Sequence, residues 1–311
     1  MGVCESSSPH ERLACADRGA RDISPPSGRL LGVAFEPIMT AMSDISFEEH
    51  PDGLITLYVD GVESSAIDPS DPAHLEFEYM QQIRIAIDAI FPPGPLRVLH
   101  LGAAGCALAN ALEAGRPNSR QLAIELDPEL ATLVREWFKL PTSPRLRIRS
   151  EDARVTLETS KARWDVVVRD AFRNGRVPDQ LATAEAAASA ARICPSGLYA
   201  LNVAGEKGLA PVYREVSALK ESFAYLGAIS DPAILRGKRN GNVILLASNG
   251  PLPLDEIDRM VRRLPLPTIV VGMDRLLEGA LGFPARHDEV PFDSVPDAGA
   301  AASSAGVEAS F

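Results

Sequence analysis

The sequence predicts an α/β protein, in which a Rossmann-like, doubly wound and mostly parallel sheet carries helices on both faces and follows a small N-terminal β-hairpin and helix. Three observations predict this class. The chain has 311 residues, more than one average domain needs. Hydrophobic residues make up 46% and charged residues 23%, as in ordinary folded proteins. Between residues 96 and 203, short apolar runs alternate with amphipathic helical segments, which is typical of a parallel sheet.

Both ends of the chain differ from this pattern. Residues 1–41 contain Ser/Pro clusters and no sustained periodicity, so we expect a disordered tail there. Residues 287–311 contain no Lys or Arg and finish in Ala, Ser and Gly, which predicts a second, solvated tail. Between the tails we expect a hairpin and helix over 42–92 and the Rossmann-like domain over 93–286.

The N-terminal part starts with a β-rich run at 54–59, followed by the hairpin signal Asp60-Gly61. Asp71 and Pro72 suit the cap and the first position of a helix. An apolar stripe at helical spacing, which includes Tyr79, continues that helix until Pro92-Pro93-Gly94 ends it. The sequence therefore predicts a helix that begins near residue 71.

Most of the next strands are apolar, and most of them precede a helix. Predicted strands cover 96–101, 121–125, 145–149, 165–170 and 198–203, and predicted helices cover 106–113, 127–138, 152–160 and 179–193. A hairpin with strands at 234–238 and 242–247 is expected to close the domain. Because ligands of such sheets bind beyond the carboxyl ends of the strands, the residues that follow each strand form the candidate site.

Charge and cysteine content exclude several classes of function. The formal net charge of −11 argues against non-specific binding of nucleic acids and anionic membranes. Four cysteines without a CxxC pair and five scattered histidines provide no metal signature. No apolar stretch indicates a membrane span, and the N-terminus lacks the order of a signal peptide. We therefore expect a cytoplasmic protein without a metal and without nucleic-acid or membrane partners.

Small residues follow the first strand of the predicted sheet. The segment Gly102-Ala103-Ala104-Gly105-Cys106 would let backbone amides at a helix N-terminus approach a ligand, although a tight strand–helix turn also needs small residues. Ala104 stands where the second glycine of a GxGxxG dinucleotide motif belongs. This substitution disfavours a nicotinamide cofactor.

Acidic residues follow three later strands. Glu125 ends the second strand, where a carboxylate can accept hydrogen bonds from both hydroxyls of a ribose. Asp152, followed by Ala153, would either accept a hydrogen bond from an adenine amino group or cap the next helix. Asp170 ends the fourth strand, where it would either orient an amine nucleophile and accept its proton or cap another helix.

Together these motifs resemble those of the spermidine synthase (polyamine aminopropyltransferase) family, which has the class I S-adenosylmethionine-dependent methyltransferase fold. The resemblance covers residues 54–248. The segments that carry it are Leu57–Val62, Asp68–Tyr79, Val98–Gly102, Ile124–Asp127, Glu151–Ala153, Trp164–Asp170 and Gly241–Ser248. No single motif is specific, but their common order along the chain favours this family.

The resemblance implies an enzyme of polyamine biosynthesis that moves an aminopropyl group from decarboxylated S-adenosylmethionine to a small amine such as putrescine. Tyr79 and Asp170 would bind and deprotonate the amine, although Tyr79 also fits a core position on its apolar stripe. The residues that would hold the donor nucleoside are Gly102, Ala103, Gly105, Glu125, Asp152 and Ala153. The resemblance implies no metal, and it leaves a homodimer open.

The chain departs from the family in ways that make it a divergent, spermidine synthase-like branch. Gly105 and Cys106 occupy the stretch where the family usually carries an acid that neutralises the donor's amine. Arg173, with Arg176 nearby, replaces a second acid that usually follows the catalytic aspartate, and the helix of Tyr79 lacks the usual His and Glu. Two alternatives therefore stay open: an S-adenosylmethionine-dependent methyltransferase with another substrate, and a nucleoside-binding protein that has lost catalysis.

Overall fold

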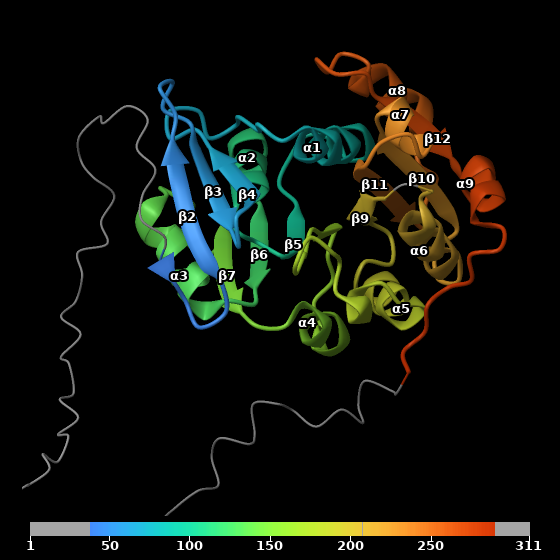
Figure 1. Ribbon diagram of the computed structural model, residues 1–311, viewed down its shortest axis with the longest axis horizontal. Coiled ribbons are helices and arrows are strands. Elements are labelled where there is room, and N and C mark those ends of the chain that lie inside the picture. The colour runs from blue at the N-terminus through green and yellow to red at the C-terminus, as the bar shows by residue number, and fades with distance from the viewer. Residues whose placement is uncertain (1–37, 207, 290–311) are drawn as a thin grey trace, which may run out of the picture.

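The computed structural model describes residues 38–206 and 208–289. These residues form a four-stranded antiparallel sheet and an eight-stranded sheet that carries helices on both faces (Figure 1). The architecture confirms the predicted α/β class with an N-terminal β region. Within the described ranges, no helix has the length and apolar character needed to span a membrane.

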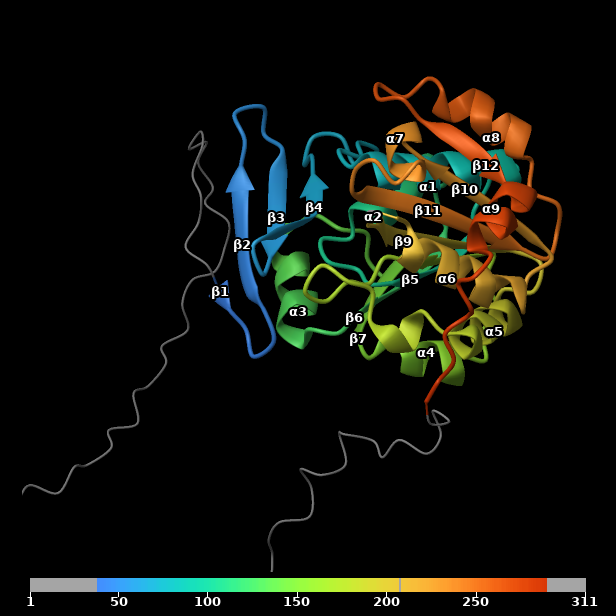
Figure 2. The same cartoon turned by 45° about the vertical axis from the view of Figure 1, so that its right-hand side comes forward.

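The N-terminal sheet is larger than the predicted hairpin. Its strands, in spatial and chain order, are β1 (Ile38–Met39), β2 (Asp44–Glu49), β3 (Ile55–Val59) and β4 (Val62–Ile67). The predicted hairpin is β3–β4, which turns at Asp60-Gly61, and the whole sheet stands to one side of the larger one (Figure 2). Residues 38–41 were expected to be disordered, but β1 pairs with β2 and Thr40 donates a hydrogen bond of 2.6 Å to Asp127. The rest of that expected tail lies outside the described residues.

Helix α1 (Glu78–Ile90) begins later than the sequence predicted. The carboxylate of Asp71 accepts a hydrogen bond of 2.9 Å from the amide of Ala73, and Asp68 does the same for Ser70 at 2.7 Å. Such local bonds hold the backbone in turns and compete with a helix. The expected start at residue 71 is therefore wrong, whereas the helix does end just before Pro92.

The larger sheet changes from parallel to antiparallel partway across. Its strands are β5 (Arg97–Leu101), β6 (Arg120–Glu125), β7 (Leu146–Ser150), β8 (Val166–Arg169), β9 (Leu198–Gly205), β10 (Tyr225–Ser230), β11 (Gly241–Ser248) and β12 (Ile269–Gly272). The spatial order is β12-β10-β11-β9-β8-β5-β6-β7, with parallel pairing from β9 to β7. The parallel strands match the five predicted strands to within about two residues, a usual boundary error. Strand order reverses at β5, between β6 and β8.

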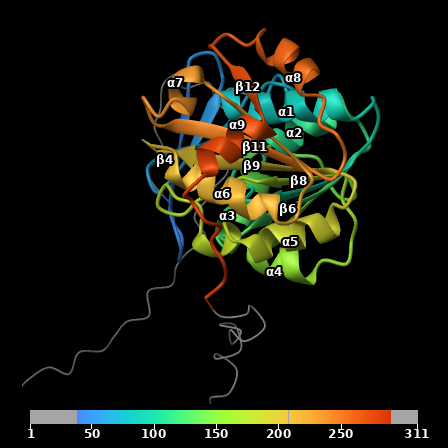
Figure 3. The same ribbon diagram turned by 90° about the vertical axis from the view of Figure 1, so that its right-hand side faces the viewer.

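Two groups of helices cover the two faces of this sheet. They are α2 (Ala107–Gly115), α3 (Pro128–Trp137), α4 (Ala153–Thr159), α5 (Ala184–Ile193), α6 (Ala210–Lys220), α8 (Leu254–Val261) and α9 (Met273–Ala280). Helices α1, α2, α3 and α8 pack on one face and α4, α5, α6 and α9 on the other (Figures 1 and 3). Because side chains alternate along a strand, Val98 of β5 enters the first core and Leu99 the second. The sheet is therefore buried on both sides.

The predicted hairpin at 234–247 is wrong in its first strand. Residues Pro232–Leu235 form a short helix, α7, and the carboxylate of Asp231 caps it through the amide of Ala233 at 2.5 Å. Strand β11 pairs instead with β10 and β9. The predicted helix at 179–193 is also divided, into a 3₁₀ turn η1 (Asp179–Leu181) and α5, which Thr183 caps.

His100 provides a pH-dependent test of this core. It is 4% exposed in β5, its Nε2 lies 2.9 Å from Gln121 Oε1, and burial lowers its pKa to about 4. A histidine in the unfolded chain has a pKa of about 6.5. Between pH 6.5 and pH 4, approximately, only the unfolded chain therefore binds the proton. The free energy of unfolding should therefore fall as pH falls from about 6.5 to about 4, by up to about 3 kcal/mol.

Urea unfolding across this pH range measures the effect, and the His100→Gln variant should lose less stability on acidification than the wild type. Equal losses in the two proteins would contradict a buried, neutral His100.

Candidate functional site

The candidate site lies beyond the carboxyl ends of β5 and β8, next to the point where strand order reverses. Gly102 follows β5, and Asp170 follows β8 with its amide donating a hydrogen bond of 2.8 Å to Leu101 O. Gly102 has a φ of +88°, and a Cβ there would approach the carbonyl oxygen of Asp170 to 2.3 Å. Only glycine fits this contact, so Gly102 serves the close packing of the two strand ends.

Tyr79 and Asp170, the two predicted catalytic residues, meet directly. The Tyr79 hydroxyl on α1 donates a hydrogen bond of 2.8 Å to Asp170 Oδ2, and Asn202 Nδ2 on β9 donates one of 2.9 Å to Asp170 Oδ1. Burial raises the pKa of Asp170, while the hydrogen bonds from Asn202 and Tyr79 oppose that rise. Burial, together with the Asp170 carboxylate, raises the pKa of Tyr79 well above its usual value, which keeps its hydroxyl proton in place. The sequence reasoning missed Asn202, although an amide inside an apolar strand was the available signal.

A buried ion pair holds the strand end from which Asp170 projects. Arg169, the last residue of β8, is fully buried and contacts the Glu215 carboxylate through Nη1 at 2.6 Å and Nη2 at 3.0 Å. The same two nitrogens donate to Leu181 O at 3.0 Å and Asn202 O at 3.2 Å. Arg169 thus joins β8 to α6, η1 and β9 immediately before Asp170.

On the side of β6, Glu125 contacts the small-residue loop. Its Oε2 accepts hydrogen bonds from the amides of Ala103 at 3.3 Å and Ala104 at 2.9 Å, and its Oε1 accepts one of 3.2 Å from Asp127. Asp127 also caps α3, as its sequence context indicated. The structure therefore brings the predicted nucleoside-binding loop and Glu125 together, with the carboxylate holding the loop in shape.

The loop carries no acid at Gly105 or Cys106. A Cβ on Gly105 would lie 2.7 Å from both Cβ and Oγ of Ser65, so no side chain fits there. Cys106 is 4% exposed, and burial, with the charge of Glu125, raises the pKa of its thiol to about 12. The loop therefore holds a buried, neutral thiol at Cys106, in the stretch where the family resemblance implied an acid.

Asp152 caps the helix that follows it, which is one of the two roles expected for it. Its Oδ1 accepts hydrogen bonds from the amides of Arg154 at 2.6 Å and Val155 at 3.3 Å, and Ala153 is the first helical residue. Its Oδ2 accepts a hydrogen bond of 2.9 Å from Gln180 Nε2 of η1. Gln180, which the sequence reasoning did not single out, therefore lies beside Asp152.

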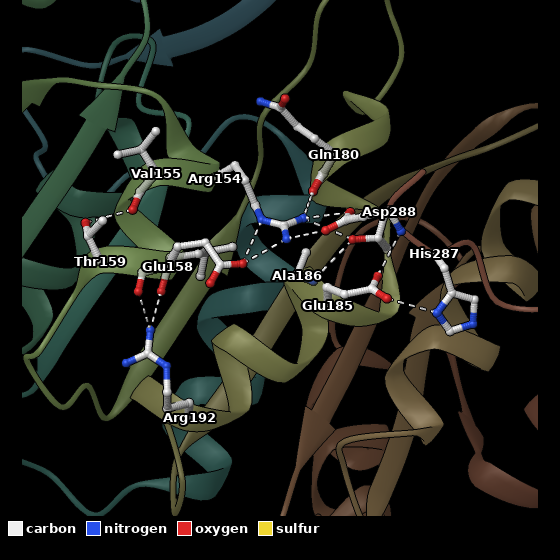
Figure 4. Close-up of polar contacts among 12 residues, drawn as sticks. Arg154, Val155, Glu158, Thr159, Gln180, Glu185, Ala186, Arg192, His287 and Asp288 are labelled. Carbon is white, nitrogen blue, oxygen red and sulfur yellow. Dashed lines mark hydrogen bonds and ion pairs between the residues drawn. The ribbon is translucent and has the colours of Figure 1, made fainter. Parts of the chain in front are cut away.

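A second buried arginine, Arg154, holds α4 and Gln180 together (Figure 4). Arg154 is 1% exposed and contacts Asp288 at 2.6 Å, Glu158 at 2.8 Å and the carbonyl oxygen of Gln180 at 2.7 Å. His287 Nδ1 lies 3.1 Å from Glu185 in the same region. The expectation of a solvated tail from residue 287 is wrong at Asp288, because the buried guanidinium of Arg154 requires a paired carboxylate. Residues 290–311 lie outside the described residues.

The two arginines that follow Asp170, Arg173 and Arg176, lie on an exposed turn. Arg173 and Arg176 pair with each other through their backbones across a tight turn and are both exposed. The Arg176 side chain is 80% exposed, and its Nε lies 3.8 Å from Glu206. Neither arginine lines the pocket of about 440 Å³ that opens beside Tyr79.

Comparison with known proteins identifies relatives of the chain. It is similar to a probable spermidine synthase from Corynebacterium glutamicum ATCC 13032, with 32% identity, a TM-score of 0.77, and coverage of 86% of this chain and 100% of that one. It is 28% identical over 121 residues to a polyamine aminopropyltransferase from Vibrio vulnificus (strain CMCP6), a match that spans 38% of this chain and only 40% of that protein. A spermidine synthase in complex with the transition state analogue AdoDATO shares the fold, with a TM-score of 0.54 and 16% identity over 81% of this chain and 85% of that one. No protein-family model matches the chain.

The buried ion pair Arg169–Glu215 can be tested through the free energy of unfolding. Replacing Glu215→Gln leaves a buried guanidinium without its countercharge, and we expect a loss of about 3–5 kcal/mol in the free energy of unfolding. The control Glu256→Gln removes an exposed partner of Arg259 and should cost less than about 1 kcal/mol.

The double variant Arg169→Met/Glu215→Leu should be more stable than Glu215→Gln, because it removes both charges. Chemical denaturation measures all three variants, and a Glu215→Gln loss no larger than that of the exposed control would refute the proposed importance of the pair.

Proposed function

Because the chain belongs to the spermidine synthase family, we propose that it transfers an aminopropyl group from decarboxylated S-adenosylmethionine to a small amine such as putrescine. The observation that carries this proposal is the hydrogen bond of 2.8 Å between the Tyr79 hydroxyl and Asp170 at the strand-order reversal. A buried carboxylate held by two donors, Tyr79 and Asn202, suits the orientation and deprotonation of an amine.

The chemistry requires one bond to form and one to break. The lone pair of the neutral amine attacks the aminopropyl carbon next to the sulfonium, the carbon–sulfur bond breaks, and its electron pair stays on sulfur as methylthioadenosine leaves. The amine nitrogen then carries one proton too many, which the Asp170 carboxylate accepts. Because the sulfonium already activates the carbon, the protein contributes chiefly by holding the amine in line.

In this proposal the donor nucleoside lies against the residues that follow β5, β6 and β7. Glu125 lies at the end of β6, where its carboxylate can accept ribose hydroxyls in addition to its bonds with the loop. The loop that would approach the nucleoside contains Gly102, Ala103 and Gly105. A Cβ would not fit at Gly102 or Gly105. Asp152 and Ala153, at the start of α4, would face the adenine, with Gln180 as an added neighbour.

One observation favours a second function, methyl transfer from S-adenosylmethionine. The loop has no carboxylate at Gly105 or Cys106 to neutralise the donor's amine. A decarboxylated donor lacks its own carboxylate and would lose most from this absence, whereas S-adenosylmethionine carries an internal countercharge.

Calorimetric titration with the two donors separates the two functions. We expect decarboxylated S-adenosylmethionine to bind more tightly than S-adenosylmethionine. The reverse order would favour methyl transfer. Binding of either nucleoside without release of methylthioadenosine, across a panel of amines, would favour a protein that has lost catalysis.

Two substitutions test the roles of the paired residues. Asp170→Asn removes the proton acceptor and should lower kcat by about 10²–10⁴-fold, and Tyr79→Phe removes one hydrogen bond and should lower kcat/KM by about tenfold. Methylthioadenosine release measures both, with donor binding as the check that the fold is intact. The exposed Asp274→Asn variant on α9 serves as the matched control. An Asp170→Asn enzyme with the activity of that control would refute the assignment.

A further inference from the structure

The segment after α9, residues 281–288, runs past α6 and α5 and reaches the first turn of α4 (Figures 1 and 2). Beside α6, the carbonyl oxygen of Phe283 accepts a hydrogen bond of 2.7 Å from Ser217 Oγ. At the start of α5, the carbonyl oxygen of Arg286 accepts a hydrogen bond of 2.8 Å from the amide of Ala184. The segment is therefore attached to two helices before it reaches α4.

Glu185, in the first turn of α5, contacts the next two residues of this segment. Its Oε1 lies 3.1 Å from His287 Nδ1, and its Oε2 accepts a hydrogen bond of 3.0 Å from the amide of Asp288. The side chain of Arg286 also contacts Asp179 of η1. The backbone is therefore fixed to α5 and η1 at the position from which the Asp288 side chain projects.

The carboxylate of Asp288 pairs with the guanidinium of Arg154 through two hydrogen bonds. Its Oδ1 accepts one of 3.1 Å from Nη1, and its Oδ2 accepts one of 2.6 Å from Nη2. The Asp288 side chain is 13% exposed and that of Arg154 is 1% exposed. A pair of two parallel bonds fixes the orientation of both groups as well as their distance. Glu158 is a second acid beside Arg154, at 2.8 Å, so the guanidinium keeps one countercharge when Asp288 is replaced.

Arg154 connects Asp288 to η1 and to the cap of α5. Its Nη1 donates hydrogen bonds of 2.7 Å to the carbonyl oxygen of Gln180 and 3.1 Å to Thr183 Oγ1. Gln180 Nε2 in turn donates a hydrogen bond of 2.9 Å to Asp152 Oδ2. A chain of contacts thus joins Asp288 to Asp152 through two residues, Arg154 and Gln180.

Both oxygens of Asp152 depend on Arg154 for their placement. Oδ1 accepts a hydrogen bond of 2.6 Å from the backbone amide of Arg154, and Oδ2 accepts the bond from Gln180, which the Arg154 side chain holds. A carboxylate oxygen has two lone pairs, so Oδ2 can accept another hydrogen bond. Asp152 is only half-buried, and the amino group of an adenine is a donor of the required kind. The orientation of Oδ2 therefore decides whether such a base is recognised.

We propose that Asp288 is a positioning residue for the adenine side of the donor site. Its pairing with Arg154 holds η1 against α4 and so sets the direction in which Asp152 Oδ2 faces the base. The inference rests on the proposed function for the identity of the donor nucleoside. No bond of the transfer reaction forms or breaks at Asp288, so its replacement should weaken donor binding and leave the chemical step at Asp170 unaffected.

The pair Asp88–Arg116 provides a matched control elsewhere in the chain. Arg116 follows α2 and is 5% exposed, and its Nε donates a hydrogen bond of 2.9 Å to Asp88 Oδ1 on α1. Arg116 also donates a hydrogen bond of 2.8 Å to the carbonyl oxygen of Pro92, which precedes β5. This pair thus lies toward the amino end of β5, whereas the candidate site lies beyond its carboxyl end. Replacing either acid leaves a buried guanidinium with one countercharge fewer.

The test measures binding of two nucleosides to the full chain by calorimetry. The probes are methylthioadenosine and methylthioinosine, which carries an oxygen in place of the amino group of the base. We expect the wild type to bind methylthioadenosine at least about tenfold more tightly, because a carboxylate that faces an acceptor oxygen gains no hydrogen bond. Asp288→Asn should bind methylthioadenosine about tenfold more weakly and methylthioinosine within about twofold of the wild type, so that the preference is lost. Asp288→Glu keeps the charge and should restore most of the preference.

Two further variants separate positioning from general stability. Asp88→Asn should lower the Tm as Asp288→Asn does and keep the preference of the wild type for methylthioadenosine. Gln180→Met removes the exposed link to Asp152 without touching the buried ion pair, so it should reduce the preference at an unchanged Tm. The proposal is overturned if the wild type binds both nucleosides equally, if Asp288→Asn keeps the preference, or if Asp88→Asn loses it as well.

These outcomes are distinguishable from failure of the proposed function. In the transfer assay, Asp288→Asn should raise the KM for the donor about tenfold and keep kcat within about twofold of the wild type. A protein that loses its preference for adenine in Asp288→Asn but transfers no aminopropyl group to any amine would refute the proposed function and keep the positioning role. A protein that transfers the group with the same donor KM in Asp288→Asn as in the wild type would keep the function and refute the positioning role.

Discussion

The buried guanidinium of Arg169 is the constraint on which the site depends. A charge fully removed from water costs several kcal/mol unless its partners are close and correctly placed. Glu215 on α6 neutralises it, and the carbonyl oxygens of Leu181 and Asn202 accept further hydrogen bonds from its two Nη atoms. The pair therefore requires β8, β9, η1 and α6 to meet at one place, directly beneath Asp170.

The ion pair of Arg169 is connected to Asp170 through Asn202. Asn202 has its backbone oxygen on Arg169 and its side-chain amide on Asp170, so the ion pair and the carboxylate share a neighbour. Arg154 performs a comparable task next to Asp152, where it ties η1 to α4 and to Asp288. Two buried arginines thus hold the region around the candidate site, and each pairs with an acid that is distant in sequence, Glu215 or Asp288.

The N-terminal region completes the site from outside the Rossmann-like domain. Tyr79 on α1 reaches Asp170, Ser65 on β4 packs against Gly105, and Glu63 and Glu78 line the pocket beside Tyr79.

Local sequence signals were sufficient for the parallel half of the fold and for the main candidate residues. Apolar runs bounded by turns located β5, β8 and β9, because a strand buried on both faces must be apolar throughout, and the carboxyl ends of the parallel strands identified Glu125, Asp152 and Asp170. Sequence reasoning failed where distant contacts decide the outcome. Asp71 and Pro72 satisfy every local rule for a helix start, yet the helix begins at Glu78. Only the tertiary structure brings Asn202, Glu63 and Asp231 near Tyr79 and pairs Asp288 with Arg154, because the free energy of burying a charge or an acceptor depends on partners that no local window contains.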